Sequence, residues 1–205
     1  MIVTRAIIFI VIAYLCGSIL FGRVAAALFH KDITGDSIDG VPGTSNAYKY
    51  GGFGCGTLTL AGDVLKGLIP VFFFLRWMDP ATPWFLRAFL IAAPVIGHIL
   101  PVFFKFRGGK GNATTFAVLF ALMPVLGPFI ILAAVFIILT VLIRISPNYY
   151  TLIVTYVITL ILVLIGHYGP AITLGFSIIA VAVLIRMFAS REEKEKMEVR
   201  FIWMH

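Results

Sequence analysis

Residues 97–115 read GHILPVFFKFRGGKGNATT, and the rest of the chain can be interpreted outward from them. An apolar run that carries His98 leads into a cationic, glycine-rich loop, and residues typical of a helix start follow. Glycines allow backbone N–H groups to surround an anion, because no Cβ obstructs the approach. The stretch therefore predicts a phosphate-binding loop at the edge of an apolar segment.

Three kinds of group in this loop would favour an anion: cationic side chains, glycine amides and the N-terminus of the following helix. The candidates are Lys105, Arg107, Gly108, Gly109, Lys110, Gly111, Asn112 and Thr114, with Thr115 as a further candidate cap. The spacing is not that of a Walker A loop, G-x-x-x-x-G-K-[ST]. The alternative is a short cytoplasmic loop that is basic only because such loops usually are.

The composition is that of an integral membrane protein. Of the 205 residues 61% are apolar, and the mean hydropathy is +1.06. Apolar runs of about 20 residues, the length that crosses a hydrocarbon core, recur along the chain. We predict an all-α membrane protein with seven transmembrane helices in one domain, residues 1–205. The expected spans are 7–29, 57–75, a third ending near 104, two short helices within 116–143 divided at Pro124, Gly127 and Pro128, then 151–165 and a last ending near 186.

The 16 Lys and Arg residues exceed the 9 Asp and Glu residues, and their distribution predicts the orientation. With the N-terminus outside and the C-terminus in the cytoplasm, most of them fall on the inner side, as the positive-inside rule requires. This pattern favours anionic lipid or a small phosphorylated substrate over nucleic acid as the partner. The inner set is Lys31, Lys49, Lys105, Lys110, Arg107, Arg144 and the basic tail, which we expect to be helical; Arg5, Arg76 and Arg87 remain outside.

A polar segment, residues 30–56, precedes the second span, and we expect it to be an ordered functional loop. Ser45 and Asn46 would hydrogen-bond a ligand there, and Lys49 would pair with an anion. Turn chemistry alone is the alternative explanation. Within the next span, Asp63 and Lys66 share a helix face and are expected to form an ion pair that orients the loops.

Together these motifs resemble the bacterial membrane glycerol-3-phosphate acyltransferases that use acyl phosphate, the PlsY type. Residues 97–115 are similar to that family's G-H-x-x-P-V-F-x-K-F-[KR]-G-G-K-G-x-A-T pattern almost throughout. Residues 17–22, 42–47 and 63–67 resemble its G-S-I-P-F-G, P-G-A-T-N-A and D-x-x-K-G motifs, with Leu20 in place of proline.

The resemblance implies an enzyme of the bacterial inner membrane that transfers an acyl group from acyl phosphate to the 1-hydroxyl of glycerol 3-phosphate or a related polyol phosphate. The products would be lysophosphatidate and phosphate, and no cofactor or metal is expected. Lys110, His98 and Asn46 are the catalytic candidates. The candidates for substrate binding are Ser45, Lys49, Lys105, Arg107, Gly108, Gly109, Gly111, Asn112 and Thr114. The acceptor of the hydroxyl proton stays open between His98 and the substrate's own phosphate.

Departures from the family pattern keep two other functions in view. Lys49 stands where the family has arginine, and residues 146–149 replace its S-L-x-S segment. Residues 186–191 lack the histidine and asparagine of its R-H-x-x-N-I signature. A non-catalytic or altered-specificity relative that binds headgroups is the first alternative, and a small anion transporter is the remote one.

Overall fold

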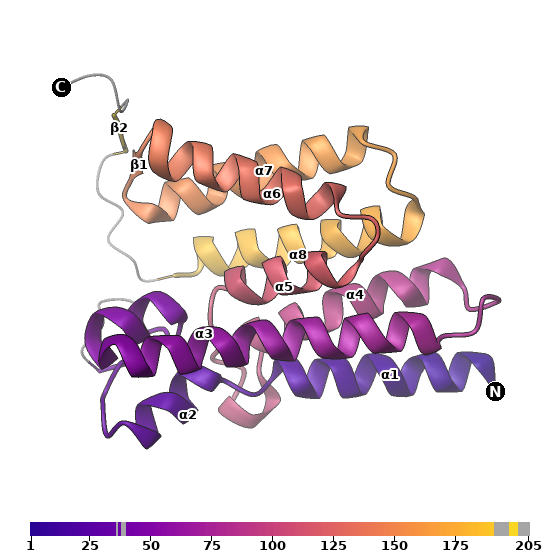
Figure 1. The fold of residues 1–205 in the computed structure, drawn as a ribbon, viewed down its shortest axis with the longest axis horizontal. Coiled ribbons are helices and arrows are strands. Elements are labelled where there is room, and N and C mark those ends of the chain that lie inside the picture. Colours follow the sequence, from indigo (N-terminus) through magenta and orange to yellow (C-terminus); the bar gives the residue numbers. More distant parts are fainter. Residues whose placement is uncertain (36, 38–39, 191–196, 201–205) are drawn as a thin grey trace.

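The computed structural model describes residues 1–35, 37, 40–190 and 197–200, and its helices run side by side in a bundle (Figure 1). In this view α6 and α7 form one side, α5 and α8 the middle, and α1, α3 and α4 the other side. The helices are α1 (Ile2–Gly17), α2 (Phe21–Leu28), α3 (Thr44–Trp77), α4 (Trp84–Ile99), α5 (Asn112–Ala121), α6 (Gly127–Ile137), α7 (Asn148–Ile165) and α8 (Pro170–Phe188), with short helices η1 (Val102–Phe104) and η2 (Ile138–Leu142).

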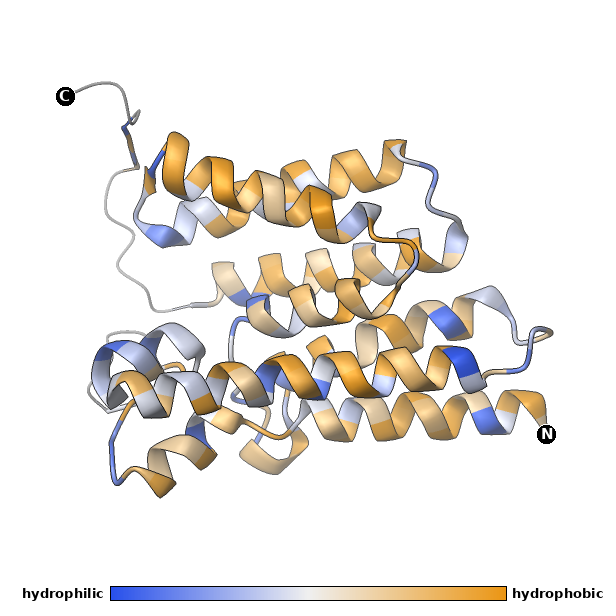
Figure 2. Cartoon of the chain, viewed as in Figure 1, coloured by the Kyte–Doolittle hydropathy of each residue, from blue (hydrophilic) through white to orange (hydrophobic). Residues whose placement is uncertain are grey.

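Five helical segments in the described residues are long and apolar enough to cross a membrane: 2–28, 44–77, 84–104, 148–165 and 170–188. Two shorter apolar helices, 112–121 and 127–142, complete the bundle. Apolar residues dominate the helices and hydrophilic ones gather at the ends (Figure 2). The fold is therefore an all-α integral membrane protein, while the count of seven spans and the orientation stay predictions.

The first predicted span is wrong in one respect, because the structure interrupts it between Gly17 and Phe21. Leu20 has extended backbone angles there, and the Ile19 carbonyl accepts a hydrogen bond from Lys66 in α3 (Nζ···O 2.7 Å). The α1 and α4 backbones meet closely just before this break. A Cβ at Gly17 would overlap the Pro94 carbonyl, so only glycine permits this approach.

The segment predicted as a long loop is also partly wrong. Helix α3 begins already at Thr44, and Gly52, with a φ of 83°, divides it into two helical pieces. The glycines of this segment predict turns. In the structure the left-handed backbone of one glycine, Gly52, is enough to change the chain direction between two helical pieces. The tail differs as well where it is described: β2 (Glu198–Val199) pairs antiparallel with β1 (Ile145–Ser146). The rest of the predicted tail helix, 191–196 and 201–205, lies outside the described residues.

The predicted division of residues 116–143 is confirmed, since α5 ends at Ala121 and α6 begins at Gly127. The main core lies where α4, α5, α7 and α8 meet. Its largest fully buried side chains include Ile91, Leu119, Tyr156, Phe176 and Ile179.

One end of the bundle gathers the elements that carry the motifs. The start of α3, the end of α4, the start of α5, the start of α7 and the end of α8 all lie at the left in Figure 1. The N-terminus, the α3–α4 connection and the α7–α8 turn lie at the opposite end. Motifs that are far apart in the sequence therefore meet at one end of the bundle.

Candidate active site

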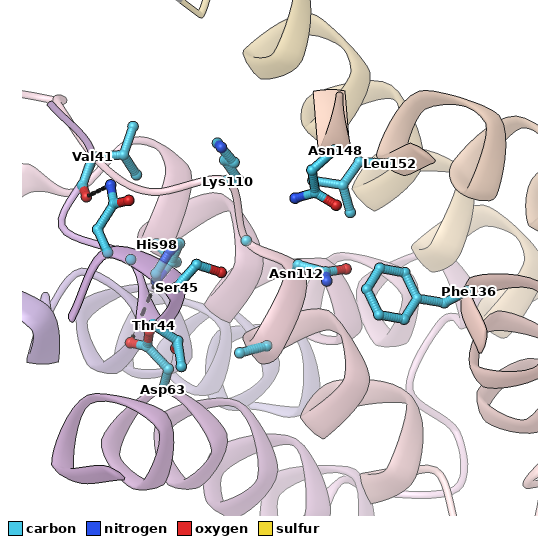
Figure 3. Close-up of a pocket in the computed structure, with 14 residues that line it drawn as sticks. Val41, Thr44, Ser45, Asp63, His98, Lys110, Asn112, Phe136, Asn148 and Leu152 are labelled. Atoms are coloured by element: carbon cyan, nitrogen blue, oxygen red, sulfur yellow. Dashed lines mark hydrogen bonds and ion pairs between the residues drawn. The ribbon is translucent and has the colours of Figure 1, made fainter. Parts of the chain in front are cut away.

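A cavity of about 210 Å³ opens at the motif-bearing end of the bundle (Figure 3). Helices α3 to α7 and the loop before α5 contribute to it. Its lining residues are Val41, Gly43, Thr44, Ser45, Asn46, Asp63, His98, Lys110, Gly111, Asn112, Ala113, Phe136, Asn148 and Leu152.

The first turn of α3 supplies three polar side chains to the cavity: Thr44, Ser45 and Asn46. Asn46 donates from Nδ2 to the Val41 carbonyl at 2.8 Å, which holds the preceding loop against the helix start. The Thr44 hydroxyl oxygen is buried and has no hydrogen-bond partner among the described residues. This turn thus presents hydroxyl groups to whatever occupies the cavity.

The glycine-rich loop supplies the cationic part of the cavity. Lys110 extends beside it in Figure 3, and Gly111, with a φ of 87°, turns the chain into α5. The N-terminus of this ten-residue helix therefore opens on the cavity at Asn112, where free N–H groups and the helix dipole favour an anion. The Tyr156 hydroxyl donates to Asn112 Oδ1 at 3.2 Å and so fixes that side chain from α7.

A buried charged cluster forms the floor of the cavity. Lys66 Nζ lies 2.7 Å from Asp63 Oδ1 and 2.7 Å from His98 Nδ1, and His98 Nδ1 lies 3.6 Å from Asp63 Oδ1. Asp63 and His98 line the cavity and face one another in Figure 3, whereas Lys66 is not among the lining residues. The ion pair predicted between Asp63 and Lys66 is present, with both side chains 2% exposed.

Two glycines of the loop pack against this cluster. Gly109 donates from its N–H to the His98 carbonyl at 3.0 Å, and a Cβ at this glycine would overlap His98 Nε2. A Cβ at Gly108 would overlap the same carbonyl. From α8, Arg186 donates to the Gly108 carbonyl at 3.1 Å. These contacts hold the loop from both sides and leave its next residue, Lys110, facing the cavity.

The second wall of the cavity comes from α6 and α7. Phe136 and Leu152 give it an apolar surface, and Asn148 adds an exposed amide at the start of α7. Figure 3 shows these side chains across the cavity from Ser45 and Lys110. The cavity is therefore polar on one side and largely apolar on the other.

The structure brings six of the predicted site residues to this cavity: Ser45, Asn46, His98, Lys110, Gly111 and Asn112. Gly108 and Gly109 lie just behind it, against His98. Four others lie elsewhere. The side chains of Lys49, Lys105 and Arg107 are exposed and do not line the cavity, and Thr114 is buried, where its hydroxyl donates to the Asp63 carbonyl at 3.2 Å.

Sequence reasoning missed the second wall and Thr44. Asn148 follows Pro147 at a helix start, which is a usable local signal. Phe136 and Leu152 carry no such signal, because an apolar residue in a membrane helix gives no indication of which neighbour it faces.

Chemically, the cavity suits a phosphorylated ligand with an attached polyol or acyl group. One lysine, the amides at a helix N-terminus and several hydroxyl or amide groups converge on a small volume. No metal or cofactor is needed for such an arrangement to bind a phosphate.

Comparison with known sequences identifies the family of the chain. A family model described as glycerol-3-phosphate acyltransferase matches residues 7–197. The glycerol-3-phosphate acyltransferase of Klebsiella pneumoniae subsp. pneumoniae is 45% identical over 107 residues, which are 52% of this chain and 51% of that protein. The match thus spans about half the length of that relative. The corresponding protein of Pseudomonas paraeruginosa is 33% identical over 189 residues, covering 89% of this chain and 95% of its own length.

The fold is also similar to a solved structure. The crystal structure of PlsY, an integral membrane glycerol 3-phosphate acyltransferase, in its glycerol 3-phosphate form has a TM-score of 0.76 and 29% identity, covering 88% of this chain and 87% of that one. The lysophosphatidic acid form gives a TM-score of 0.69 at the same identity. On the family match and on this similarity in sequence and fold, the chain belongs to the glycerol-3-phosphate acyltransferase family.

Proposed function

We propose that this protein transfers an acyl group from acyl phosphate to the 1-hydroxyl of glycerol 3-phosphate in the bacterial inner membrane, as a step of phospholipid synthesis. The observation that carries the proposal is the shared cavity. Residues 43–46 and 110–113, far apart in the sequence, line one volume at the end of the bundle where the membrane surface is expected.

The cavity offers a distinct place for each part of the substrates. Lys110, the Gly111 backbone and the α5 N-terminus would hold a phosphate group. Ser45 and Asn46 would hydrogen-bond the glycerol hydroxyls. The acyl chain would leave past Phe136 and Leu152 toward the apolar interior, which is why the enzyme is embedded in the membrane.

The reaction needs positioning more than covalent help from the protein. The C1 hydroxyl oxygen attacks the acyl carbonyl carbon, a new C–O ester bond forms, and the bond from that carbon to the phosphate oxygen breaks. Inorganic phosphate leaves with the electron pair, and the hydroxyl proton ends on it or on a group that passes it to solvent. Holding both anions side by side and stabilising the developing negative charge would supply much of the rate enhancement.

The geometry around His98 supports the substrate phosphate as the proton acceptor. The Nδ1 atom of His98 already contacts the Lys66 ammonium, and its Nε2 atom is packed against Gly109. Because an ammonium can only donate, Nδ1 accepts from Lys66 and Nε2 carries the ring proton, so neither nitrogen has a lone pair for a hydroxyl proton. A phosphate oxygen bound beside Lys110 would meet the hydroxyl directly.

The test is incubation of the purified protein in lipid vesicles with palmitoyl phosphate and glycerol 3-phosphate. We expect equal amounts of lysophosphatidate and released phosphate, with little phosphate released when glycerol 3-phosphate is left out. Binding of both substrates without transfer would contradict the proposal and would favour the non-catalytic relative, for which the altered segment 186–191 is the motivation.

A further inference from the structure

Lys66 is the one member of the buried cluster that does not line the cavity, yet it contacts its own helix and two other parts of the bundle. Its ammonium lies 2.7 Å from Asp63 Oδ1 on α3, 2.7 Å from the Ile19 carbonyl at the α1–α2 break and 2.7 Å from His98 Nδ1 on α4. An ammonium has three N–H donors and no acceptor. Lys66 hydrogen-bonds the Ile19 carbonyl and His98 Nδ1, and Asp63 Oδ1 pairs with its charge, so the ammonium ties its own helix to two other parts of the bundle.

This arrangement determines which nitrogen of His98 carries the proton. Because a lysine ammonium can only donate, His98 Nδ1 must accept, and the ring proton then lies on Nε2. That nitrogen is the one packed against Gly109. The ring orientation and the position of the loop are therefore coupled.

We propose that Lys66 is a positioning residue for the phosphate-binding loop. It fixes the tautomer and the orientation of His98, and through the ring and carbonyl of His98 it holds Gly108 and Gly109 so that Lys110 faces the cavity. The inference rests on the proposed function only in assigning a phosphate to that loop. Lys66 itself touches neither substrate.

The surroundings of Lys66 show why this position is suited to holding the loop. Burying a lysine and a carboxylate in a membrane protein is costly, and simple packing of α3 on α4 would not require either charge. The remaining charged group near the loop, Arg186, holds the Gly108 carbonyl from the α8 side. Arg186 thus holds Gly108 directly from the α8 side, whereas Lys66 acts on Gly108 and Gly109 through His98.

The experiment compares three purified variants with the wild-type protein. Lys66→Met removes the donor and leaves Asp63 beside His98. The double variant Asp63→Asn with Lys66→Met removes both charges. It replaces the single variant if Lys66→Met fails to fold because Asp63 is left buried without its partner. Thr59→Val is the matched control, because it deletes a buried hydrogen bond on the same helix, from its hydroxyl to the Cys55 carbonyl at 2.8 Å, without any link to His98.

Two readouts need no catalytic activity. Nitrogen-15 NMR of labelled histidine, with His98 assigned by a His98→Asn variant, reports which ring nitrogen is protonated. Hydrogen exchange followed by mass spectrometry reports protection of the loop peptide that contains Gly109. We expect an unprotonated Nδ1 in the wild type and in Thr59→Val. In Lys66→Met we expect a proton on Nδ1, directed at Asp63, and faster exchange of the loop.

A wild-type ring protonated on Nδ1 would overturn the inference. So would a loop that exchanges at the wild-type rate in both Lys66 variants. The binding arm uses glycerol 3-phosphate and inorganic phosphate in calorimetry, and we expect affinity for both to fall by about tenfold, as for one misaligned hydrogen bond to a charged group. If the wild type binds neither ligand while the NMR and exchange results are as expected, the proposed function fails and the positioning of the loop by Lys66 stands.

Discussion

The two walls of the cavity differ in the chemical groups that they present to a ligand. The first wall, from α3, α4 and the loop before α5, carries a lysine, hydroxyls, amides and backbone N–H groups. The second wall, from α6 and α7, carries Phe136 and Leu152 with a single amide at its edge. One wall is suited to headgroups and the other to an acyl chain, so substitutions in the two should affect different substrates.

The strongest test of the first wall is Lys110→Ala. It removes the cavity's lysine, and we expect transfer to fall by about 10² to 10³, the loss typical of deleting one stabilising contact to developing charge. Labelled palmitoyl phosphate and glycerol 3-phosphate in vesicles give the rate. Lys31→Ala is the matched control, because it removes an exposed lysine in the α2–α3 connection and should keep wild-type activity. A wild-type rate of acyl transfer in Lys110→Ala would show that the reaction does not depend on the lysine of this wall.

Gly109→Ala tests the backbone of the first wall rather than its charge. The added methyl group would overlap His98 Nε2, so the loop or the ring must move. A displacement of about 1 Å in a positioned group can reduce a rate by about 10²-fold. We expect a raised KM for glycerol 3-phosphate together with a lower kcat, and an unchanged rate would show that the loop is not positioned by this contact. The melting temperature serves to separate this effect from unfolding.

The second wall is tested by Phe136→Ala. Loss of apolar contact should raise the KM for palmitoyl phosphate by about tenfold, since burial of a large apolar side chain stabilises by roughly 1.5–3 kcal/mol and only part of it contacts the chain. The KM for glycerol 3-phosphate and the kcat with acetyl phosphate should stay near wild type. Equal effects on palmitoyl and acetyl phosphate would mean that the two walls do not divide the substrates between them.

The smallest effect is expected from Lys105→Ala combined with Arg107→Ala. Both side chains are exposed outside the cavity, so they act on the anionic substrates only through long-range electrostatic attraction. We predict a two- to threefold lower kcat/KM at low ionic strength that disappears in about 1 M salt, where charges are screened within about 3 Å. A loss as large as that of Lys110→Ala, and independent of salt, would place the phosphate at the surface of the loop.

The first wall could be predicted from the sequence because each of its parts is a short contiguous motif. Residues 110–112 combine a lysine, a glycine and a residue typical of a helix start, and these neighbouring groups favour an anion without any help from distant parts of the chain. The same reasoning failed for Lys105 and Arg107, because charge alone does not give direction. Lys105 has a φ of 52°, and that turn of the backbone leaves both side chains at the surface.

The break after Gly17 and the second wall of the cavity could not be predicted, because they depend on packing between helices. The break after Gly17 is understandable only once Lys66 is seen to bond the Ile19 carbonyl. Similarly, the apolar second wall arises from how α6 and α7 lie against α5, and no residue type in a membrane helix encodes that neighbour. The all-α class and the division between α5 and α6 needed only hydropathy and proline, which act locally.

The proposal that the cavity binds the substrate phosphate is tested most directly by the position of the phosphorus atom of glycerol 3-phosphate in an experimental structure of this protein with that ligand bound. We predict that the phosphate lies in the cavity, within hydrogen-bond distance of the Lys110 ammonium and of the backbone amides at the start of α5. A phosphate bound instead at the exposed Lys105 and Arg107, with the cavity unchanged, would contradict the account.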